Sequence, residues 1–330
     1  MRFVFNPVYQ LKETDTEFIF YNEINILAIE KTLSSAKIVS LLNDGADLTQ
    51  LKQEKHFRIF FENDLIQVEN KNEIIPDFYK KNLGIFYIKE SFSSRSVFSS
   101  HLQTGNICAC ILGIGGIGSV IFENLVRSGI NKILLIDFDL VNEVDLNRQI
   151  IYSNKDFNVK KIVAAERYGS TINKNIVIQS FDLKINHIDD LDVLKTHAID
   201  IFIQAADSEL SKLNDIVNLY CFQNKISFFT VSSGLTKGYW GPLLNYNERE
   251  TLISINRDVE LLDTENLEYF DQIKNTVSYF SFGPSNMIIA AQASYDIISF
   301  LWKMSNVRSL NKRLFYDIDN LNHFSINYHE

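Results

Sequence analysis

Short apolar runs alternate with amphipathic stretches over the second two thirds of the chain. Near-continuous apolar segments predict strands at Ile107–Gly113, Lys132–Asp139, Ile176–Leu183, Ile199–Ala206 and Ile226–Ser233. Apolar positions at helical spacing predict helices at 117–128, 159–172 and 208–224 between these strands. Strands that are apolar on both faces and joined by helices form a parallel sheet covered on both sides. The pattern therefore predicts an α/β fold with a Rossmann-like, doubly wound sheet.

The spacing of apolar positions changes after Gly234. Tyr239–Tyr246 and Thr251–Ile255 are predicted to be antiparallel strands, Pro284–Lys303 a long helix, and Arg313–Tyr328 a closing hairpin. The sheet is thus expected to be mostly parallel, with antiparallel strands at its C-terminal end.

The first 90 residues lack this alternation of strands and helices. Their pattern predicts strands at Phe18–Tyr21, at Ile24–Ile29 and from Ile66, with helices at Thr32–Asn43 and Asp47–Phe61. This combination indicates a small α+β module of winged-helix type, followed by a polar connector with a helix over 82–106. We expect two domains, residues 1–85 and residues 86–330, and a peptide is the expected ligand of the first.

Composition narrows the function classes. The chain has 330 residues, of which 46% are hydrophobic, and a formal net charge of −9. An acidic surface disfavours sequence-independent binding to nucleic acid, which needs clustered Lys and Arg. The N-terminus has no signal-peptide pattern, and polar residues interrupt the apolar stretch Met287–Trp302, so no membrane segment is expected. The three cysteines (Cys108, Cys110 and Cys221) form no disulfide framework and are expected to be buried, which favours a cytoplasmic location.

A glycine cluster follows the first predicted strand of the sheet. Gly113, Gly115, Gly116 and Gly118 lie where this strand ends and a helix begins, so backbone amides there can approach a phosphate. Asp137 and Asp139 end the next strand, where a carboxylate can accept hydrogen bonds from ribose hydroxyls. Asp139 is alternatively a cap for the loop that follows. These positions predict a nucleotide site.

Two cations downstream indicate which nucleotide is bound. Arg148 follows the loop after the second strand, and Lys161 opens the next helix. A triphosphate must be neutralised by cations and metal, whereas a dinucleotide pyrophosphate needs little beyond a helix N-terminus. Asp207 ends a third strand, at the edge that faces the ligand crevice, where it can hold Mg²⁺ or cap the following helix.

These residues, in this order, resemble the ThiF/MoeB/MccB branch of the ubiquitin-activating enzyme superfamily. The family pattern reads here as Gly113–Gly118, Asp137-Phe-Asp139, Asp145-Leu-Asn147-Arg148-Gln149, Lys161 and Ala206-Asp207-Ser208. The resemblance covers about residues 100–325. The later segments Trp240–Leu243, Phe282–Asn286 and Ser309–Arg313 are most similar to MccB-type members, which modify a ribosomally made peptide.

The resemblance implies a homodimeric enzyme that uses ATP and Mg²⁺ to adenylate a carboxyl group. The glycines, Asp137, Asp139, Asn147, Arg148, Gln149 and Lys161 would then bind ATP, and Asp207 would bind Mg²⁺. Residues 1–85 would clamp the precursor peptide. The family also lends a cation from one subunit to the ATP of the other, and here Lys81, or Lys80, occupies that stretch.

Three departures from the family pattern refine this expectation. The paired Cys-x-x-Cys motifs that bind structural zinc in most relatives are absent, so no zinc site is expected. The cysteines lie in a strand and a helix, which argues against thioester transfer. The asparagine that usually begins the Asn-x-x-Arg-Gln motif is Asp145.

The sequence therefore predicts ATP-dependent adenylation of a peptide carboxyl group in the maturation of a peptide antibiotic. The adenylate would be the product, or an atom of the same peptide would capture it, with net loss of water as in pantocin-type pathways. Two other classes stay open: an NAD-dependent dehydrogenase, and a non-catalytic peptide-binding protein with the same fold. A dehydrogenase would leave Arg148 and Lys161 without a role.

Overall fold

Two units make up the chain, Met1–Leu102 and Gln103–Glu330, and each is described by itself. The structure is a computed structural model that describes residues 2–69, 78, 80–82, 84–85, 107–207, 210–255 and 280–328. The predicted domain boundary at residues 85/86 and the predicted helix within 82–106 fall almost entirely outside these residues. Both therefore stay predictions.

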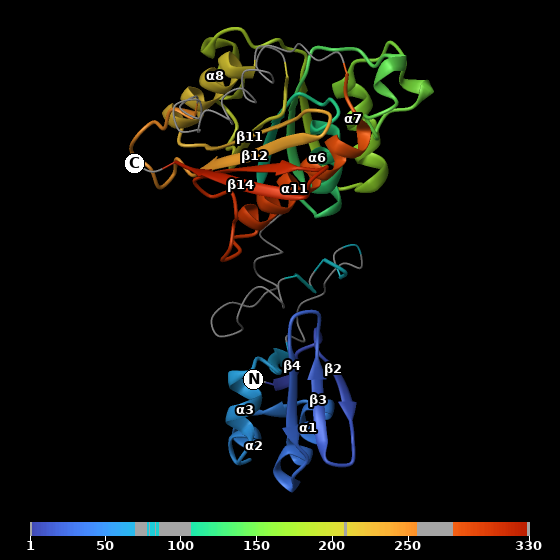
Figure 1. The fold of residues 1–330 in the computed structure, drawn as a ribbon, viewed down its shortest axis with the longest axis vertical. Coiled ribbons are helices and arrows are strands. Elements are labelled where there is room, and N and C mark those ends of the chain that lie inside the picture. Colours follow the sequence, from blue (N-terminus) through green and yellow to red (C-terminus); the bar gives the residue numbers. More distant parts are fainter. Residues whose placement is uncertain are drawn as a thin grey trace. The chain divides into compact units, whose positions relative to one another are not determined.

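In residues 2–69, the first unit has small antiparallel sheets packed with short helices (Figure 1). One sheet has the strand order β2-β3-β4, and the other has the order β5-β1-β6. The strands are β1 (Arg2–Phe5), β2 (Gln10–Glu13), β3 (Glu17–Tyr21), β4 (Ile26–Glu30), β5 (Ala46–Asp47) and β6 (Ile66–Glu69). The helices are α1 (Leu33–Asp44), α2 (Leu48–Lys52) and α3 (Phe57–Glu62). The small α+β module is confirmed, although the sequence did not indicate β1 or β2.

The helix predicted at Asp47–Phe61 is wrong as a single element. Asp47 caps α2 as expected, with its side chain accepting from the amide of Gln50, but α2 ends at Lys52. His56 is then tied to the start of α1, because its amide donates to Ser34 Oγ and its Nδ1 lies 3.3 Å from Thr32 Oγ1. These contacts divide the segment into α2 and α3.

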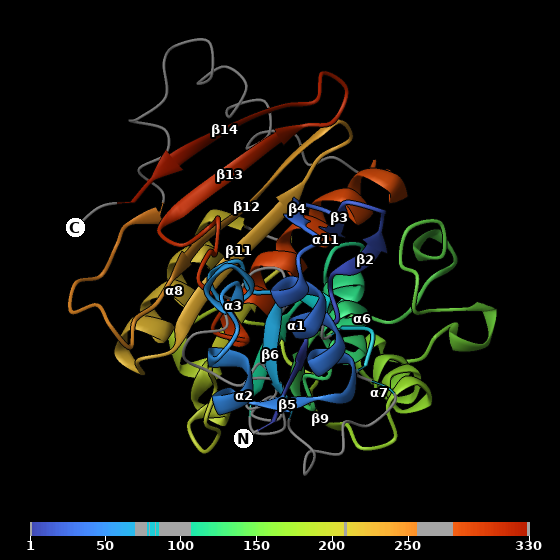
Figure 2. The same ribbon diagram turned by 90° about the horizontal axis from the view of Figure 1, so that it is seen from below.

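The second unit is built on one eight-stranded sheet with the order β14-β13-β12-β11-β10-β7-β8-β9 (Figures 1 and 2). The five strands from β11 to β9 run parallel, and β12, β13 and β14 are antiparallel. Their bounds are β7 (Cys108–Leu112), β8 (Lys132–Ile136), β9 (Val177–Phe181), β10 (Ile201–Gln204), β11 (Ser227–Ser233), β12 (Lys237–Leu244), β13 (Lys312–Asp317) and β14 (Asn322–Asn327). The predicted mostly parallel sheet and its antiparallel C-terminal strands are confirmed.

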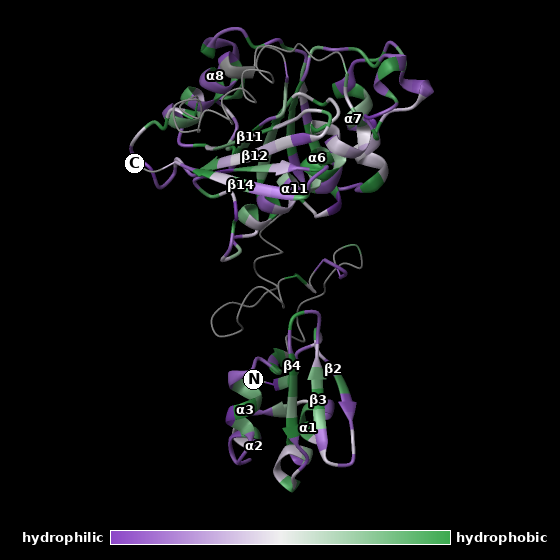
Figure 3. Cartoon of the chain, in the orientation of Figure 1, coloured by the Kyte–Doolittle hydropathy of each residue, from purple (hydrophilic) through white to green (hydrophobic). Residues whose placement is uncertain are grey.

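Helices cover both faces of this sheet. They are α6 (Gly118–Arg127), α7 (Lys161–Ile172), α8 (Leu210–Gln223) and α11 (Gly283–Leu301), with the 3-10 helices η3 (Glu143–Asp145), η4 (Asn154–Asp156) and η5 (Ile188–Leu194). A buried cluster joins alternate residues of β7, β8, β10 and β11 to α8 and η5, and it includes none from α6, α7 or α11. We therefore assign α6, α7 and α11 to the opposite face. The central strands are largely hydrophobic (Figure 3), as a doubly covered sheet requires.

The strand predicted at Thr251–Ile255 is wrong. This segment is irregular in the structure, and the buried side chains of Ile253 and Ile255 pack into the cluster that includes α8. The carbonyl of Ile253 accepts from the side chain of Asn218, so an amide side chain takes the place of a neighbouring strand.

No helix in the described ranges combines the length and the apolar composition needed to cross a bilayer.

Candidate functional site

The glycine turn joins β7 to α6 at the carboxyl edge of the parallel strands. Gly113 has a φ of +88°, and a Cβ there would lie 2.8 Å from the backbone nitrogen and Cα of Ala206. A Cβ on Gly116 would collide with the side chain of Asn286. No side chain caps the N-terminus of α6, and the amides of Ser119 and Val120 donate to the carbonyls of Gly115 and Ile117. An anion at this turn would therefore be held by the amides of the glycine turn itself, with the positive end of the α6 dipole behind them. The predicted geometry of the turn is thus present.

Asp137 fastens the ends of β7 and β8 to each other. Its two carboxylate oxygens accept from the backbone amides of Ile114, at 2.7 Å, and Asp139, at 2.8 Å. Desolvation raises the pKa of this buried carboxyl above its usual value, although the two amides and Lys161 act in the opposite direction. Each oxygen keeps a second lone pair that can accept from a ribose hydroxyl.

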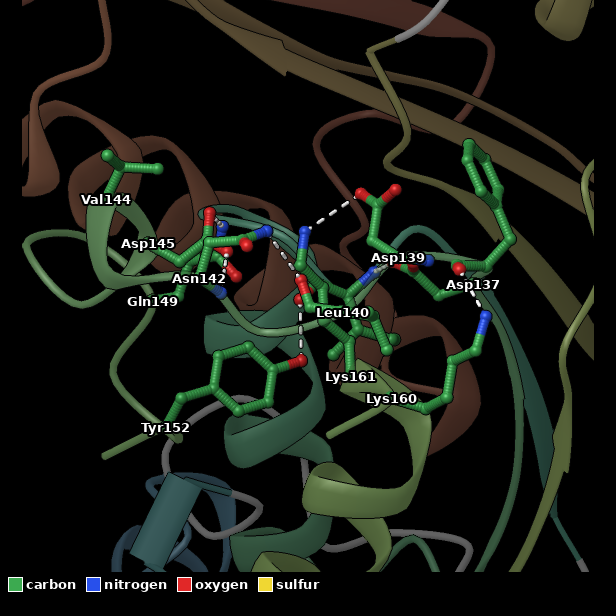
Figure 4. A network of polar contacts seen from close by, with 12 residues as sticks. Asp137, Asp139, Leu140, Asn142, Val144, Asp145, Gln149, Tyr152, Lys160 and Lys161 are labelled. Carbon is green, nitrogen blue, oxygen red and sulfur yellow. Dashed lines mark hydrogen bonds and ion pairs between the residues drawn. The ribbon is translucent and has the colours of Figure 1, made fainter. Parts of the chain in front are cut away.

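Lys161, the first residue of α7, is held beside the end of β8. Its Nζ lies 3.0 Å from Asp139 Oδ2, and its amide donates to the carbonyl of Asp139 (Figure 4). The neighbouring Lys160 bonds Asp182 and the carbonyl of Phe138 instead. The structure therefore brings Lys161, Asp139 and Asp137 into one group, as the sequence predicted.

The loop from Asn142 to Gln149 is organised by a buried carboxylate. Asp145 Oδ2 accepts from the amide of Asn142 at 2.9 Å, and Oδ1 accepts from Gln149 Nε2 at 2.7 Å (Figure 4). Arg148 Nη2 lies 3.3 Å from the same Oδ1. Arg148 is thus paired within its own loop.

Arg148 also lies beside the glycine turn and the start of α11. A Cβ on Gly116 would be 3.6 Å from its Cγ, and a Cβ on Gly283 would be 3.5 Å from its Cα. Asn147 contributes through its side-chain oxygen, which accepts from Arg148 Nη1 at 3.1 Å. The N-terminal ends of α6 and α11 therefore lie beside the backbone and the aliphatic stem of Arg148.

Asp207 is exposed where the chain leaves β10. Its neighbour Ala206 packs on Gly113, and the amide of Ala206 donates to the buried side chain of Gln204 at 2.6 Å. Residues 208 and 209 lie outside the description, so the predicted capping role of Asp207 stays a prediction. A single exposed carboxylate beside a phosphate-binding turn fits Mg²⁺, which enters such sites on one or two carboxylates together with substrate phosphates. The described residues contain no cluster of three or more His, Cys, Asp or Glu that could hold a metal without a ligand.

Two residues of the site were given no role in the sequence analysis. Tyr152 is buried, and its hydroxyl donates to the carbonyl of Ile114 at 2.9 Å, which helps to hold the glycine turn in place. Asn286 packs against Gly116 and is also buried. Asn286 belongs to the segment Phe282–Asn286 that carries the family resemblance, whereas nothing in the sequence distinguishes Tyr152 from an ordinary core aromatic.

Lys80 and Lys81 belong to the first unit, so their predicted action on a bound nucleotide stays a prediction. All three cysteines are buried, Cys108 and Cys110 in β7 and Cys221 in α8. Desolvation raises the pKa of each thiol, that of Cys108 to about 11.

Comparison with known proteins agrees with this geometry. The ThiF family matches residues 101–329, more than half of the chain. The chain is 28% identical over 141 residues to ubiquitin-like modifier-activating enzyme 5 of Drosophila mojavensis, which covers 39% of this chain and 35% of that protein. It is 28% identical over 168 residues to a probable molybdopterin-synthase adenylyltransferase of Porphyra purpurea, covering 47% and 41%. The matched part is thus less than half the length of either relative.

Solved structures match almost the whole chain. The crystal structure of E. coli MccB with ATP has a TM-score of 0.78 at 23% identity, and the match covers 99% of this chain and 97% of that one. The structure of the microcin C7 biosynthetic enzyme MccB with N-formylated MccA has a TM-score of 0.77 at 24% identity, with the same coverage. Identities this low establish a shared fold.

Proposed function

This chain belongs to the ThiF family, and on that basis we propose that it is an ATP-dependent adenylyltransferase that activates a carboxyl group of a ribosomally made peptide. Two contacts support the proposal: the stem of the Arg148 side chain lies against the glycine turn, and Lys161 Nζ lies beside Asp139 where β8 ends. A triphosphate needs this combination of amides and cations.

The chain's own residues divide the work of binding. Amides of the glycine turn would hold phosphate oxygens at the positive end of the α6 dipole, and Asp137 would accept from the ribose hydroxyls. Lys161 and Arg148 would offset the charge that develops as pyrophosphate leaves. Asp207 would hold Mg²⁺, which neutralises phosphate charge when it is bound.

The reaction is a substitution at the α-phosphorus of ATP. A carboxylate oxygen of the peptide forms a bond to that phosphorus while the bond to the bridging oxygen of the β-phosphate breaks. The products are an acyl-adenylate and pyrophosphate. Asp137, with its oxygens already fixed by Ile114 and Asp139, would keep the ribose and hence the α-phosphorus in line for this attack.

The first unit would supply the peptide site. Its own buried core, which includes Phe18, Phe20 and Phe60, supports it as a separate recognition module. The structural match to MccB, whose solved complex contains N-formylated MccA, supports a peptide as the ligand. Within the same proposal the enzyme acts as a homodimer, in which Lys81, or Lys80, of one subunit reaches the ATP of the other.

The fate of the adenylate follows from the cysteines. Their buried thiols, with raised pKa values, are poorly suited to accept an acyl group, which disfavours a thioester relay. The adenylate would then be the product, or the same peptide would capture it in a dehydrative cyclisation during antibiotic maturation.

The test is to incubate the purified chain with Mg·ATP and candidate short peptides, and to measure pyrophosphate release and peptide mass. Transfer of AMP or loss of water supports the proposal, and Arg148→Ala should lower the rate on the order of 10²–10³-fold. NADH oxidation without pyrophosphate would indicate a dehydrogenase instead. Product formation in vivo that is undiminished by Arg148→Ala and Asp207→Ala would indicate a non-catalytic peptide-binding role.

A further inference from the structure

The loop Asn142–Gln149 closes around one buried negative charge. Asp145 is 4% exposed, and its two carboxylate oxygens accept from the amide of Asn142, from Gln149 Nε2 and from Arg148 Nη2. Its carbonyl also accepts the amides of Arg148 and Gln149. Asp145 thus determines the shape of the loop and the direction of the Arg148 side chain.

Arg148 directs its donors back at this loop. Nη1 donates to the carbonyl of Val144 and to Asn147 Oδ1, while Nη2 faces Asp145. The contact to Asp145, at 3.3 Å, is longer than a strong charge-assisted bond, which spans about 2.7–2.9 Å. It is therefore a contact that a phosphate oxygen can replace.

We infer that Asp145 is a positioning residue that holds the Arg148 guanidinium on its own loop until a phosphate displaces it. The negative charge of Asp145 thereby lowers the affinity of the site for phosphate, which makes the release of pyrophosphate easier. This inference rests on the proposed role of Arg148 in binding ATP.

The charge of Asp145 matters because an amide at this position would bond differently. In an Asp145→Asn variant, Oδ1 would accept from the amide of Asn142 and Nδ2 would donate to Gln149 Oε1. In the structure Gln149 Oε1 is buried and accepts from none of the described residues. Gln149 would have to turn its amide to present Oε1, which moves Nε2 into the buried place that Oε1 occupies now. Arg148 would be left without a carboxylate to hold it.

The experiment compares wild type and Asp145→Asn for Mg·ATP affinity by calorimetry, and for KM, kcat and pyrophosphate inhibition in the peptide reaction. We expect Asp145→Asn to bind Mg·ATP about three- to tenfold more tightly, because an uncompensated guanidinium attracts phosphate more strongly. The inhibition constant of pyrophosphate should fall by a similar factor, and kcat should not rise.

Matched variants separate this role from a general effect of charge or folding. Glu143→Gln removes a negative charge from an exposed position of the same loop and should leave the affinity within twofold of wild type. In an Arg148→Met background, Asp145→Asn should no longer tighten binding. If Asp145→Asn does not fold, Asp145→Ser is the second variant, because Ser35 accepts from the amide of Thr32 at the same spacing.

Unchanged or weaker binding of Mg·ATP in the folded variants overturns the inference. Equal tightening in the Arg148→Met background overturns it too, because the effect would then not pass through Arg148. A wild-type chain that binds Mg·ATP but modifies no peptide would contradict the proposed function and leave this comparison intact. A wild-type chain that binds no Mg·ATP would contradict both.

Discussion

Arg148 and Lys161 each face a carboxylate, but the two carboxylates differ in exposure. The side chain of Asp139, the partner of Lys161, is 49% exposed, whereas that of Asp145, the partner of Arg148, is 6% exposed. Water can solvate Asp139 when Lys161 turns to a phosphate, but it cannot reach Asp145 in the same way. Lys161 therefore exchanges its partner at lower cost than Arg148 does.

Lys161→Met tests whether Lys161 contributes to the reaction by binding a phosphate. Methionine can fill the buried space of Lys161, and Asp139 remains solvated, so the fold should persist while pyrophosphate release slows on the order of 10²–10³-fold. Stopped assays of pyrophosphate together with thermal unfolding measure both quantities. Asp139→Asn, which keeps the cation, is the control and should lose much less activity.

The thiols give a prediction about pH. The pKa of Cys108 rises from 9.0 to about 11 through desolvation, so the folded chain keeps this proton at a pH where the unfolded chain has lost it. The unfolding free energy should therefore fall as pH rises from about 9 towards 11, because the unfolded state then binds fewer protons. Denaturant titrations at several pH values measure this trend, and Cys108→Ala should make it shallower, because the buried thiols of Cys110 and Cys221 still contribute.

A thiol reagent gives the matching check. At pH 8 the folded chain should react negligibly with it, and all three cysteines should react after denaturation. Rapid labelling of the native chain would contradict the assigned burial of the thiols.

The sequence indicated much of the site, because glycines and charged residues at strand ends have few structural alternatives. Gly113, Asp137 and Lys161 lie together as their spacing suggested. The pairing of Arg148 with Asp145 could not be predicted, because it depends on how an irregular loop folds back. Tyr152 could not be predicted either, since its role is a contact of its hydroxyl across 38 residues of sequence.

At the level of elements, α11 is fixed by an ion pair whose carboxylate is buried and whose arginine side chain is 37% exposed. Asp296 is fully buried in this helix, and its carboxylate accepts from Trp240 Nε1 and Arg308 Nε, both at 2.8 Å. Arg308 also bonds the side chain of Gln292. The same helix begins at Gly283 against Arg148, so the ion pair anchors an element that borders the candidate site.

Asp296→Ala should therefore destabilise the second unit strongly. It leaves the indole N–H of Trp240 without its acceptor and takes one partner from Arg308, which keeps its bonds to Gln292, so we expect a loss of about 2–3 kcal/mol. Urea unfolding of the two chains measures the difference. Asp317→Ala is the control, because Asp317 pairs with Lys237 nearer the surface and should cost about 1 kcal/mol or less. Similar losses of unfolding free energy in the two variants would contradict the larger stabilising role assigned to Asp296.

The elements that the sequence predicted well are those with a single strong periodicity. The central strands and α11 are so largely buried that their apolar pattern fits only one type of secondary structure. Asp47–Phe61 and Thr251–Ile255 were misassigned because side chains far away in sequence, His56 bonding Ser34 and Asn218 bonding Ile253, decide their conformation. Such contacts leave no trace in a local pattern.

On the scale of the whole molecule, each unit has a hydrophobic core of its own. The first contains the cluster with Phe20, Ile38 and Phe60, and the second contains the cluster that joins β7, β10 and α8. Independent cores allow the two units to unfold separately.

Calorimetry of the intact chain should therefore show two transitions. Phe60→Ala, which removes a fully buried ring from the first core, should lower one transition and leave the other in place. Val217→Ala in α8 should do the reverse. A single transition that shifts as a whole in both variants would show that the units unfold together.

The buried position of Cys108, Cys110 and Cys221 has a practical consequence. If the native thiols do not react with maleimides, a single added cysteine can be labelled without first removing the other three. One fluorophore, attached at an engineered cysteine in place of exposed Glu143, would sit on the segment that carries Arg148. Its emission could then report, in real time and in the otherwise native protein, when the Arg148 guanidinium leaves Asp145.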